Sequence, residues 1–311
     1  MAYYSESPVS ARFTLNQEEF ERFAALSGDD NPIHVDPQFA ALTKFGKPVA
    51  HGMHLYSLIC RVLGSALPGP GTMILSQEMM FPAPTFAGEE ITVAVRTLRT
   101  QSIPPWYSGD PASQPGNTPG RYIQVETTIT KQDGTACLRG VAWALTPGPG
   151  IAMLADFLRG PDVVPQEIDQ SDANTHRNLS LGESASIRRT YTEGDLIEYG
   201  ELTGDLNPLY APCDYAKKMG FSGPIVPPGL TGGLFSNLLG TKLPGRGTNW
   251  LKQTLVFANP AYIGEELTAT VKVVRLRPEK DLVNLHTSCE KKDGEVVCSG
   301  GALVLVSDIG A

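Results

Sequence analysis

The chain has 311 residues, enough for about two domains, and 41% of them are hydrophobic while 19% are charged. This is the composition of a globular protein and excludes a disordered or collagen-like chain. The formal net charge of −8 argues against nucleic acid or an anionic membrane as a partner.

Two helices are predicted near the start of the chain. Asn16 is a candidate N-cap with Glu19 three residues later, which is the spacing of a capping box, and Gly28 ends this helix. The Asp-Pro pair at 36–37 is typical of an N-cap and a first helical position. It predicts a short helix that continues to about residue 43.

A longer helix is predicted from Gly52 to about residue 66. Apolar residues cover nearly all of its faces, so we expect it to be enclosed on most sides. Alternating or β-branched runs then predict strands at 72–81, 90–100, 121–131 and 136–146. Pro, Gly and Ser dominate residues 102–120, which predicts an irregular insertion.

The second half of the chain repeats the first. The pattern Ser/Thr-Gly-Asp-x-Asn-Pro-Ile/Leu occurs at 27–33 and again at 203–209, an offset of 176 residues. The same offset relates Leu-Pro-Gly at 67–69 to Leu-Pro-Gly at 243–245. Matching strands are predicted at 248–257, 266–276, 282–290 and 295–306. We interpret the chain as an internal duplication.

The predicted organisation is two tandem units and a linker. Residues 1–146 form the first unit, the Pro- and Gly-rich residues 147–185 form a linker with one short helix near 150–159, and residues 186–311 form the second unit. One buried helix and four or five antiparallel strands in each unit favour an α+β fold in which a sheet wraps around the helix. Joining the two sheets edge to edge covers strand edges that would otherwise be exposed.

The compartment is predicted from three absences in the sequence. Five scattered cysteines without a Cys-x-x-Cys pair are typical of reduced thiols and do not suggest a zinc site. No run of 18 apolar residues is present, so we expect no membrane span. The chain starts without the blocks of a secretory signal and ends without a peroxisomal tripeptide. We therefore expect a cytoplasmic protein.

The residues able to do chemistry are densest at 27–34. Pro32 disfavours the helical region at Asn31, so the chain turns sharply, and the turn can bring Asp29 and His34 to one cavity. A carboxylate and an imidazole that share a cavity are suited to moving a proton to and from water. The alternative is a structural turn, in which the Asp and Asn side chains bond backbone amides.

The second copy of this cluster differs at one position. It keeps Asp205 and Asn207, while Tyr210 stands where the first copy has His34. A structural turn explains the shared residues but does not require a histidine in one copy alone. Tyrosine, with a pKa near 10, is a poor proton acceptor at neutral pH, so we expect one active site per chain.

Gly52 begins the enclosed helix, where the first amides lack internal partners and carry the positive end of the helix dipole. Glycine lets a thioester carbonyl oxygen approach such an amide, and an oxyanion hole of this kind contributes on the order of 3 kcal/mol. The alternative is a glycine needed only for helix–sheet packing. His51 and His54 are interpreted as hydrogen-bonded structural histidines, and the histidine spacing does not fit metal ligation.

Residues 27–64 resemble the hydratase 2 motif of the MaoC-like, (R)-specific enoyl-CoA hydratase family. The degenerate second copy extends the resemblance to almost the whole chain, as in the double hot-dog members of the family. The resemblance implies two tandem hot-dog domains whose sheets join as an intrachain pseudo-dimer. It also implies reversible hydration of a trans-2-enoyl-CoA to the (R)-3-hydroxyacyl-CoA, without metal or other cofactor.

The resemblance also implies roles for single residues. Asp29 and His34 match the family's catalytic dyad, Asn31 its supporting asparagine, and Gly52 the glycine whose amide polarises the thioester carbonyl. Simple members of the family often have a serine near the dyad, and Cys60 stands there in this chain.

The implied partner is an acyl-CoA thioester substrate, with no nucleic acid and no membrane, and a homodimer of double hot-dog chains is the candidate assembly. Three alternatives stay open. A 3-hydroxyacyl-carrier-protein dehydratase differs only in the carrier, a hot-dog thioesterase would hydrolyse the same ligand, and a binding module would not turn it over.

Overall fold

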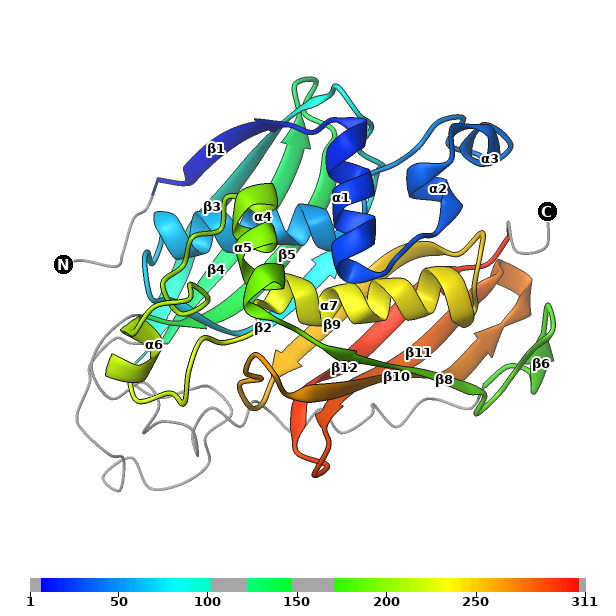
Figure 1. Ribbon diagram of the computed structural model, residues 1–311. Helices are drawn as coiled ribbons and strands as arrows, with labels where there is room; N and C mark the ends of the chain where they lie inside the picture. Colours follow the sequence, from blue (N-terminus) through cyan, green and yellow to red (C-terminus); the bar gives the residue numbers. More distant parts are fainter. Residues whose placement is uncertain (1–6, 102–121, 147–170, 308–311) are drawn as a thin grey trace.

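A computed structural model describes residues 7–101, 122–146 and 171–307 (Figure 1). The first half contains β1 (Val9–Thr14), α1 (Gln17–Ser27), α2 (Pro32–Val35), α3 (Pro37–Ala41), α4 (Gly52–Ser65), β2 (Met73–Met80), β3 (Glu90–Gln101), β4 (Tyr122–Lys131) and β5 (Ala136–Leu145). The second half contains β6 (Thr175–His176), β7 (Leu179–Ser180), β8 (Ser184–Thr190), α5 (Glu193–Thr203), α6 (Tyr215–Lys218), α7 (Pro228–Asn237), the π-helical turn η3 (Leu238–Lys242), β9 (Asn249–Phe257), β10 (Glu266–Arg277), the 3₁₀ turn η4 (Pro278–Lys280), β11 (Leu282–Lys291) and β12 (Val296–Leu305).

The irregular insertion at 102–120 and the short helix near 150–159 lie outside the described residues. The unit boundaries at 146 and 186 stay predictions.

One ten-stranded antiparallel sheet runs through both halves, in the order β1-β3-β4-β5-β2-β9-β12-β11-β10-β8. The order of the second half mirrors that of the first, and β2 pairs with β9 at the centre, where Gln77 lies opposite Leu255. Each half therefore covers the sheet edge that the other would expose. The prediction of an α+β fold with two sheets joined edge to edge is confirmed.

Each half of the sheet curves around a central helix, α4 in the first half and α7 with η3 in the second (Figure 1). α4 is buried along most of its length, as predicted for the helix that begins at Gly52. The two central helices pack against each other. Gly232 permits this contact, because a Cβ atom there would lie 2.5 Å from the sulfur of Met53.

The helix that precedes each motif has the same caps in both copies. The Asn16 side chain accepts a hydrogen bond from the Glu19 amide, and the Glu19 carboxylate accepts one from the Asn16 amide, so the predicted capping box is confirmed. Thr192 and Asp195 repeat the arrangement at α5. α1 ends at Gly28, whose φ of 76° disfavours any other residue.

Several elements differ from the prediction. A sharp turn is predicted at Pro32, and the structure adds a one-turn helix, α2, which begins at Pro32 and is capped by the Asn31 side chain. Proline suits a first helical position, where its missing amide would have had no partner. The two outermost strands of the sheet, β1 and β8, were not predicted, because six or seven residues of alternation are a weak pattern.

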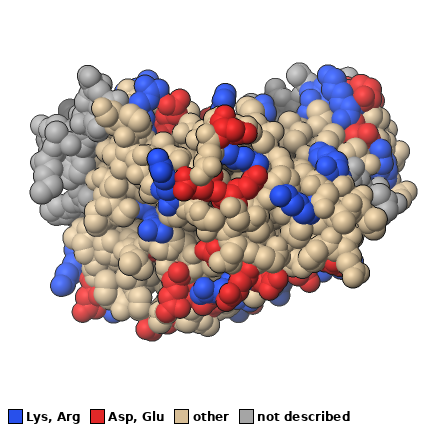
Figure 2. All heavy atoms as spheres, turned by 90° about the horizontal axis from the view of Figure 1, so that it is seen from above, with Lys and Arg blue, Asp and Glu red and all other residues tan. Residues whose placement is uncertain are grey.

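Figure 2 shows Lys and Arg side chains interspersed with Asp and Glu on the face seen from above. The described residues on this face do not form the continuous basic surface that binds phosphate backbones. No helix in the described part of the chain has the length and apolar character needed to cross a membrane.

Candidate active site

Asp29 follows Gly28, the residue that caps the end of α1, and only 1% of its surface is exposed. Its main-chain amide donates to the Ser27 hydroxyl, and its Oδ1 atom accepts from the Asn31 amide at 3.3 Å. Asn31 in turn accepts from the amide of Ile33 and so starts α2. The bonds expected of a structural turn are therefore present, and they leave the Oδ2 atom of Asp29 available to other groups.

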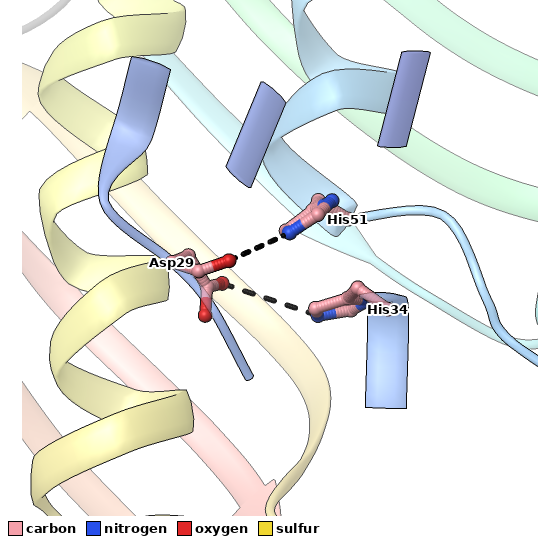
Figure 3. Close-up of side chains that lie close together, drawn as sticks. All are labelled: Asp29, His34 and His51. Carbon is pink, nitrogen blue, oxygen red and sulfur yellow. Dashed lines mark hydrogen bonds and ion pairs between the residues drawn. The ribbon is translucent and has the colours of Figure 1, made fainter. Parts of the chain in front are cut away.

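The turn brings His34 to the same oxygen. Nε2 of His34 lies 3.9 Å from Oδ2 of Asp29, too far for a direct hydrogen bond but close enough for one bridging water (Figure 3). Nδ1 of His34 lies 2.7 Å from the main-chain oxygen of Val49. Because a carbonyl oxygen only accepts, Nδ1 carries the proton of the neutral ring and Nε2 has the free lone pair.

Burial lowers the pKa of His34 below its ordinary value of 6.5. The negative charge of Asp29 and the bond to the Val49 carbonyl act in the opposite direction and only partly offset the effect of burial. At neutral pH the imidazole is therefore uncharged, and Nε2 can accept a proton.

The shortest hydrogen bond to Asp29 comes from the other half of the chain. The hydroxyl of Ser236, on α7, donates to Oδ2 of Asp29 at 2.5 Å, and Ser236 is itself buried. A hydroxyl that donates to a carboxylate at this distance forms a charge-assisted bond. Sequence reasoning missed Ser236, which stands 207 residues from its partner.

Cys60 is not among the residues that line the cavity beside Asp29 and His34. It contacts the second copy instead, where burial and the nearby charge of Asp205 raise the pKa of its thiol. Cys60 and Ser236 are separated by the duplication offset of 176 residues. Because the central helices pack across the centre of the molecule, each supplies this position to the motif of the other half. The sequence does hold a signal for Ser236: it lies 176 residues after Cys60, and each of these two residues contacts the motif of the other half.

Gly52 is the first residue of α4 and lies in the wall of the cavity that Asp29 and His34 also line. Amides in the first turn of a helix have no partner within the helix. A Cβ atom at Gly52 would lie 3.0 Å from Cζ of Phe81, so the close packing expected under the alternative reading is present as well.

The cavity has a volume of about 370 Å³ and is built by both halves. The first half supplies the motif and an apolar wall that includes Leu55 and Phe81, and the second half supplies Leu239 and Trp250. Of the described residues that line the cavity, Lys44 is the one that carries a basic side chain of the Lys or Arg type. A mostly apolar cavity with a few polar groups at one point is typical of a small-molecule site.

His51 lies behind the pair, and Asp29, His34 and His51 offer metal-ligating atoms within 4.8 Å of one another. Nε2 of His51 donates to the main-chain oxygen of Asp29 at 3.0 Å, so that nitrogen has no lone pair to offer a metal ion. The hydrogen bonds of these three residues therefore fit a structural arrangement of side chains better than a metal centre. The expectation that His54 is hydrogen-bonded is wrong, since neither ring nitrogen has a partner and the ring stacks on Phe23.

The second copy keeps the turn but not the cavity. Oδ1 of Asp205 accepts from the Asn207 amide, as in the first copy. The Asn207 side chain donates to the Thr72 carbonyl and accepts from the Gly71 amide, so it bonds the second half to the first. The space beside the buried Tyr210 has a volume of about 30 Å³, which leaves little room for a ligand.

Comparison with known proteins gives a domain that matches both halves and relatives that match less than half of the chain. The MaoC like domain matches residues 4–103 and 180–294, together more than half of the chain. An (R)-specific enoyl-CoA hydratase of Rhodospirillum rubrum is 41% identical over 129 residues, which cover 42% of this chain and 89% of that protein. A mitochondrial 3-hydroxyacyl-(acyl-carrier-protein) dehydratase of Solanum lycopersicum is 35% identical over 133 residues, 42% of this chain and 79% of that protein.

Solved structures extend the likeness to the whole chain. A Mycobacterium tuberculosis protein described as having a double hotdog fold superposes with a TM-score of 0.71 at 14% identity, and the match covers 97% of this chain and 96% of that one. At this identity the likeness concerns the fold. From the matched domain and this fold, the chain belongs to the MaoC-like domain family and is a double hot dog.

Proposed function

We propose that this chain is a hydro-lyase that reversibly adds water to a trans-2-enoyl-CoA and forms the (R)-3-hydroxyacyl-CoA. The observation that carries the proposal is the pair of Asp29 and His34, whose Oδ2 and Nε2 atoms lie 3.9 Å apart in the wall of an apolar cavity. The free lone pair on Nε2 suits a water held between the two groups. The bacterial relative, named as an (R)-specific enoyl-CoA hydratase, supports the same reaction.

In this proposal the thioester carbonyl oxygen accepts a hydrogen bond from the Gly52 amide at the start of α4. That bond and the helix dipole stabilise the negative charge that develops on the oxygen, and they draw electron density from the β-carbon. The acyl chain lies against the apolar wall contributed by both halves. Asn31 acts indirectly, by shaping the turn that holds Asp29.

Asp29 and His34 then handle the protons. The pair takes one proton from the water as its oxygen bonds to the β-carbon, and the electrons of the double bond move toward the α-carbon and the carbonyl. The pair next delivers a proton to the α-carbon, so that one water has been added in all. Because one pair serves both carbons from one side, the addition is syn. No residue in this scheme requires a metal or another cofactor.

A 3-hydroxyacyl-carrier-protein dehydratase is the second candidate, favoured by the Solanum lycopersicum relative. It would run the same chemistry in reverse with a different carrier, so the residues near the dyad do not separate the two. A comparison of kcat/KM for the same enoyl group on CoA and on an acyl carrier protein decides between them. A hot-dog thioesterase would instead release free thiol.

The test is hydration of crotonyl-CoA, followed by loss of enoyl-thioester absorbance together with a free-thiol assay. Asp29→Asn should lower kcat about 10²–10⁴-fold, because the amide cannot accept the proton. Asp205→Asn, the matching change in the second copy, should keep the parent kcat. A folded Asp29→Asn protein with the parent rate would exclude this role for Asp29, and thiol release by the parent would support the thioesterase.

A further inference from the structure

His51 is the residue directly before α4, and its side chain is wholly buried. The mechanism above gives it no task. Its Nε2 atom donates to the main-chain oxygen of Asp29 at 3.0 Å, and Figure 3 shows this bond beside the Asp29–His34 pair. The donated bond holds the backbone of the residue whose carboxylate faces His34.

The ring of His51 also supports His34. The two ring centroids are 3.8 Å apart and the ring planes differ by 29°, which is a stacked contact. His34 is held at its Nδ1 edge by the Val49 carbonyl at 2.7 Å. A ring that is fixed at one edge and covered on one face has little freedom to rotate, so its Nε2 atom stays directed at Asp29. His51 therefore contacts both members of the pair.

His51 performs both tasks as a neutral ring with one defined tautomer. Burial lowers the pKa of His51 well below its ordinary value, and the neighbouring His34 lowers it further. Its Nδ1 atom is buried without a hydrogen-bond partner. A second proton there would be costly, because a buried charge needs a partner. The proton thus stays on Nε2, where it bonds Asp29.

The second copy lacks His51 and His34 together. Tyr210 stands in place of His34. Pro227 directly precedes α7 where His51 directly precedes α4, and Pro228 begins α7 where Gly52 begins α4. Proline has no side-chain donor, so the bond to the motif's backbone has no equivalent there. The histidine at 51 accompanies the histidine at 34 in the copy that has the cavity.

We propose that His51 is a positioning residue, which aligns Asp29 and His34 with the water between them and does not touch the substrate. This inference rests on the hydration reaction proposed above. Misplacement of a reacting group by about 1 Å costs on the order of 10²-fold in rate. Loss of the alignment should therefore lower kcat and leave KM nearly unchanged.

Three variants separate the bond, the ring and general packing. His51→Phe keeps a ring and removes the donor, whereas His51→Gln keeps a donor and removes the ring. His54→Phe is the matched control, because His54 is equally buried on α4 but has no hydrogen bond at either ring nitrogen. For crotonyl-CoA hydration by folded proteins, we expect His51→Phe to lower kcat about 10- to 100-fold at a KM within about two-fold of the parent. His51→Gln should recover part of this loss, and His54→Phe should keep the parent kcat.

The opposite results overturn the proposal. A folded His51→Phe protein with the parent kcat would do so, and an equal loss in His54→Phe would assign the effect to packing. A change confined to KM would place His51 in substrate binding instead. Failure of His51→Gln to recover any activity would remove the role of the donated bond.

A second measurement depends on neither activity nor the folding of the variants. In the parent protein with ¹⁵N-labelled histidine, NMR at about pH 8 should show the proton of His51 on Nε2 and that of His34 on Nδ1. The other tautomer at His51 would overturn the proposal. If the tautomers are as expected but the parent hydrates no enoyl thioester, the proposed function fails and the alignment of the pair stands.

Discussion

The nitrogen of His34 that carries the proton decides what this residue can do. The Val49 carbonyl holds the proton on Nδ1, so Nε2 faces Asp29 as an acceptor. An imidazole with the other tautomer would present a donor to the water and could not take its proton. A backbone carbonyl thus prepares the side chain for its proposed role, and no other side chain is needed to set the tautomer.

The pH dependence of the reaction should reflect this histidine. Because burial lowers the pKa of His34 below 6.5, the neutral form that can accept a proton prevails from below pH 6.5 upward. We expect kcat/KM for crotonyl-CoA to be level between about pH 7 and 8 and to fall only as the pH drops through the lowered pKa. Initial rates between about pH 5 and 8 measure this. An acidic limb with its midpoint at or above 6.5 would contradict it.

Ser236 is the residue whose contribution most depends on the fold. Ser236→Ala removes the hydroxyl that donates to Oδ2 of Asp29. A hydrogen bond to a charged group contributes about 1.5–3 kcal/mol, so kcat should fall roughly 10- to 100-fold. Cys60→Ser is the control at the matching position and should keep the parent kcat. Equal activity in Ser236→Ala and the parent would show that the bond does not orient the carboxylate during catalysis.

At the scale of elements, α7 and η3 form one wall of a site whose motif belongs to the other half. Gly240 of η3 lies against that motif, because a Cβ atom there would be 3.0 Å from Oδ1 of Asp29 and 2.9 Å from Nδ2 of Asn31. Gly64 of α4 is the equivalent residue in the first half, and a Cβ atom there would be 3.1 Å from Oδ1 of Asp205. Glycine at both positions lets each helix approach the opposite turn.

The two glycines make a matched pair of substitutions. Gly240→Ala and Gly64→Ala should each lower the free energy of unfolding by about 1–3 kcal/mol, because both add a methyl group to a packed contact. Only Gly240→Ala displaces the Asp29 carboxylate, and we expect it to lower kcat at least about ten-fold. Denaturant unfolding and crotonyl-CoA hydration measure the two effects. An equal loss of kcat in both variants would place the cause in general destabilisation.

At the scale of the whole molecule, the duplication produces two similar halves with unequal sites. Arg22 of α1 and Glu198 of α5, which are separated by the duplication offset, form an ion pair between the two equivalent helices. The motif of the first half receives Ser236, and that of the second half receives Cys60. One copy therefore has the cavity, and the other uses its motif to hold the halves together.

The unused carboxyl group of the second copy should make stability depend on pH. Burial raises the pKa of Asp205 from 3.8 to about 7, and the hydrogen bond from the Asn207 amide only partly offsets the effect of burial. Between about pH 4 and pH 7 the native state therefore keeps a proton that the unfolded state has released. The free energy of unfolding falls as the pH rises through this window, by on the order of 4 kcal/mol for a shift of about three units.

Asp205→Asn should remove this dependence. The amide keeps the acceptor for the Asn207 amide and cannot ionise. We expect it to raise the free energy of unfolding more at about pH 8 than at about pH 5, measured by denaturant unfolding at both values. A gain of the same size at the two pH values would show that ionisation of Asp205 is not the cause.

Much of this organisation could be predicted from local patterns. The capping box at Asn16, the end of α1 at Gly28 and the enclosed helix from Gly52 each depend on residues within a few positions of one another. The sheet strands after α4 likewise show their alternation locally. The one-turn helix α2 and the edge strands β1 and β8 were missed, because their patterns are too short to stand out.

The sequence alone indicates the duplication, the longer helices, the inner strands of the sheet, and the four candidate residues Asp29, Asn31, His34 and Gly52, since each of these follows from a local pattern, a motif or a repeat. Three features follow only from the three-dimensional arrangement: β2 pairs with β9, both halves build one cavity, and Ser236 bonds Asp29 across 207 residues. The reason is that hydrophobic packing between α4 and α7 sets these distant contacts. Packing of that kind is non-directional and leaves no pattern in either segment alone.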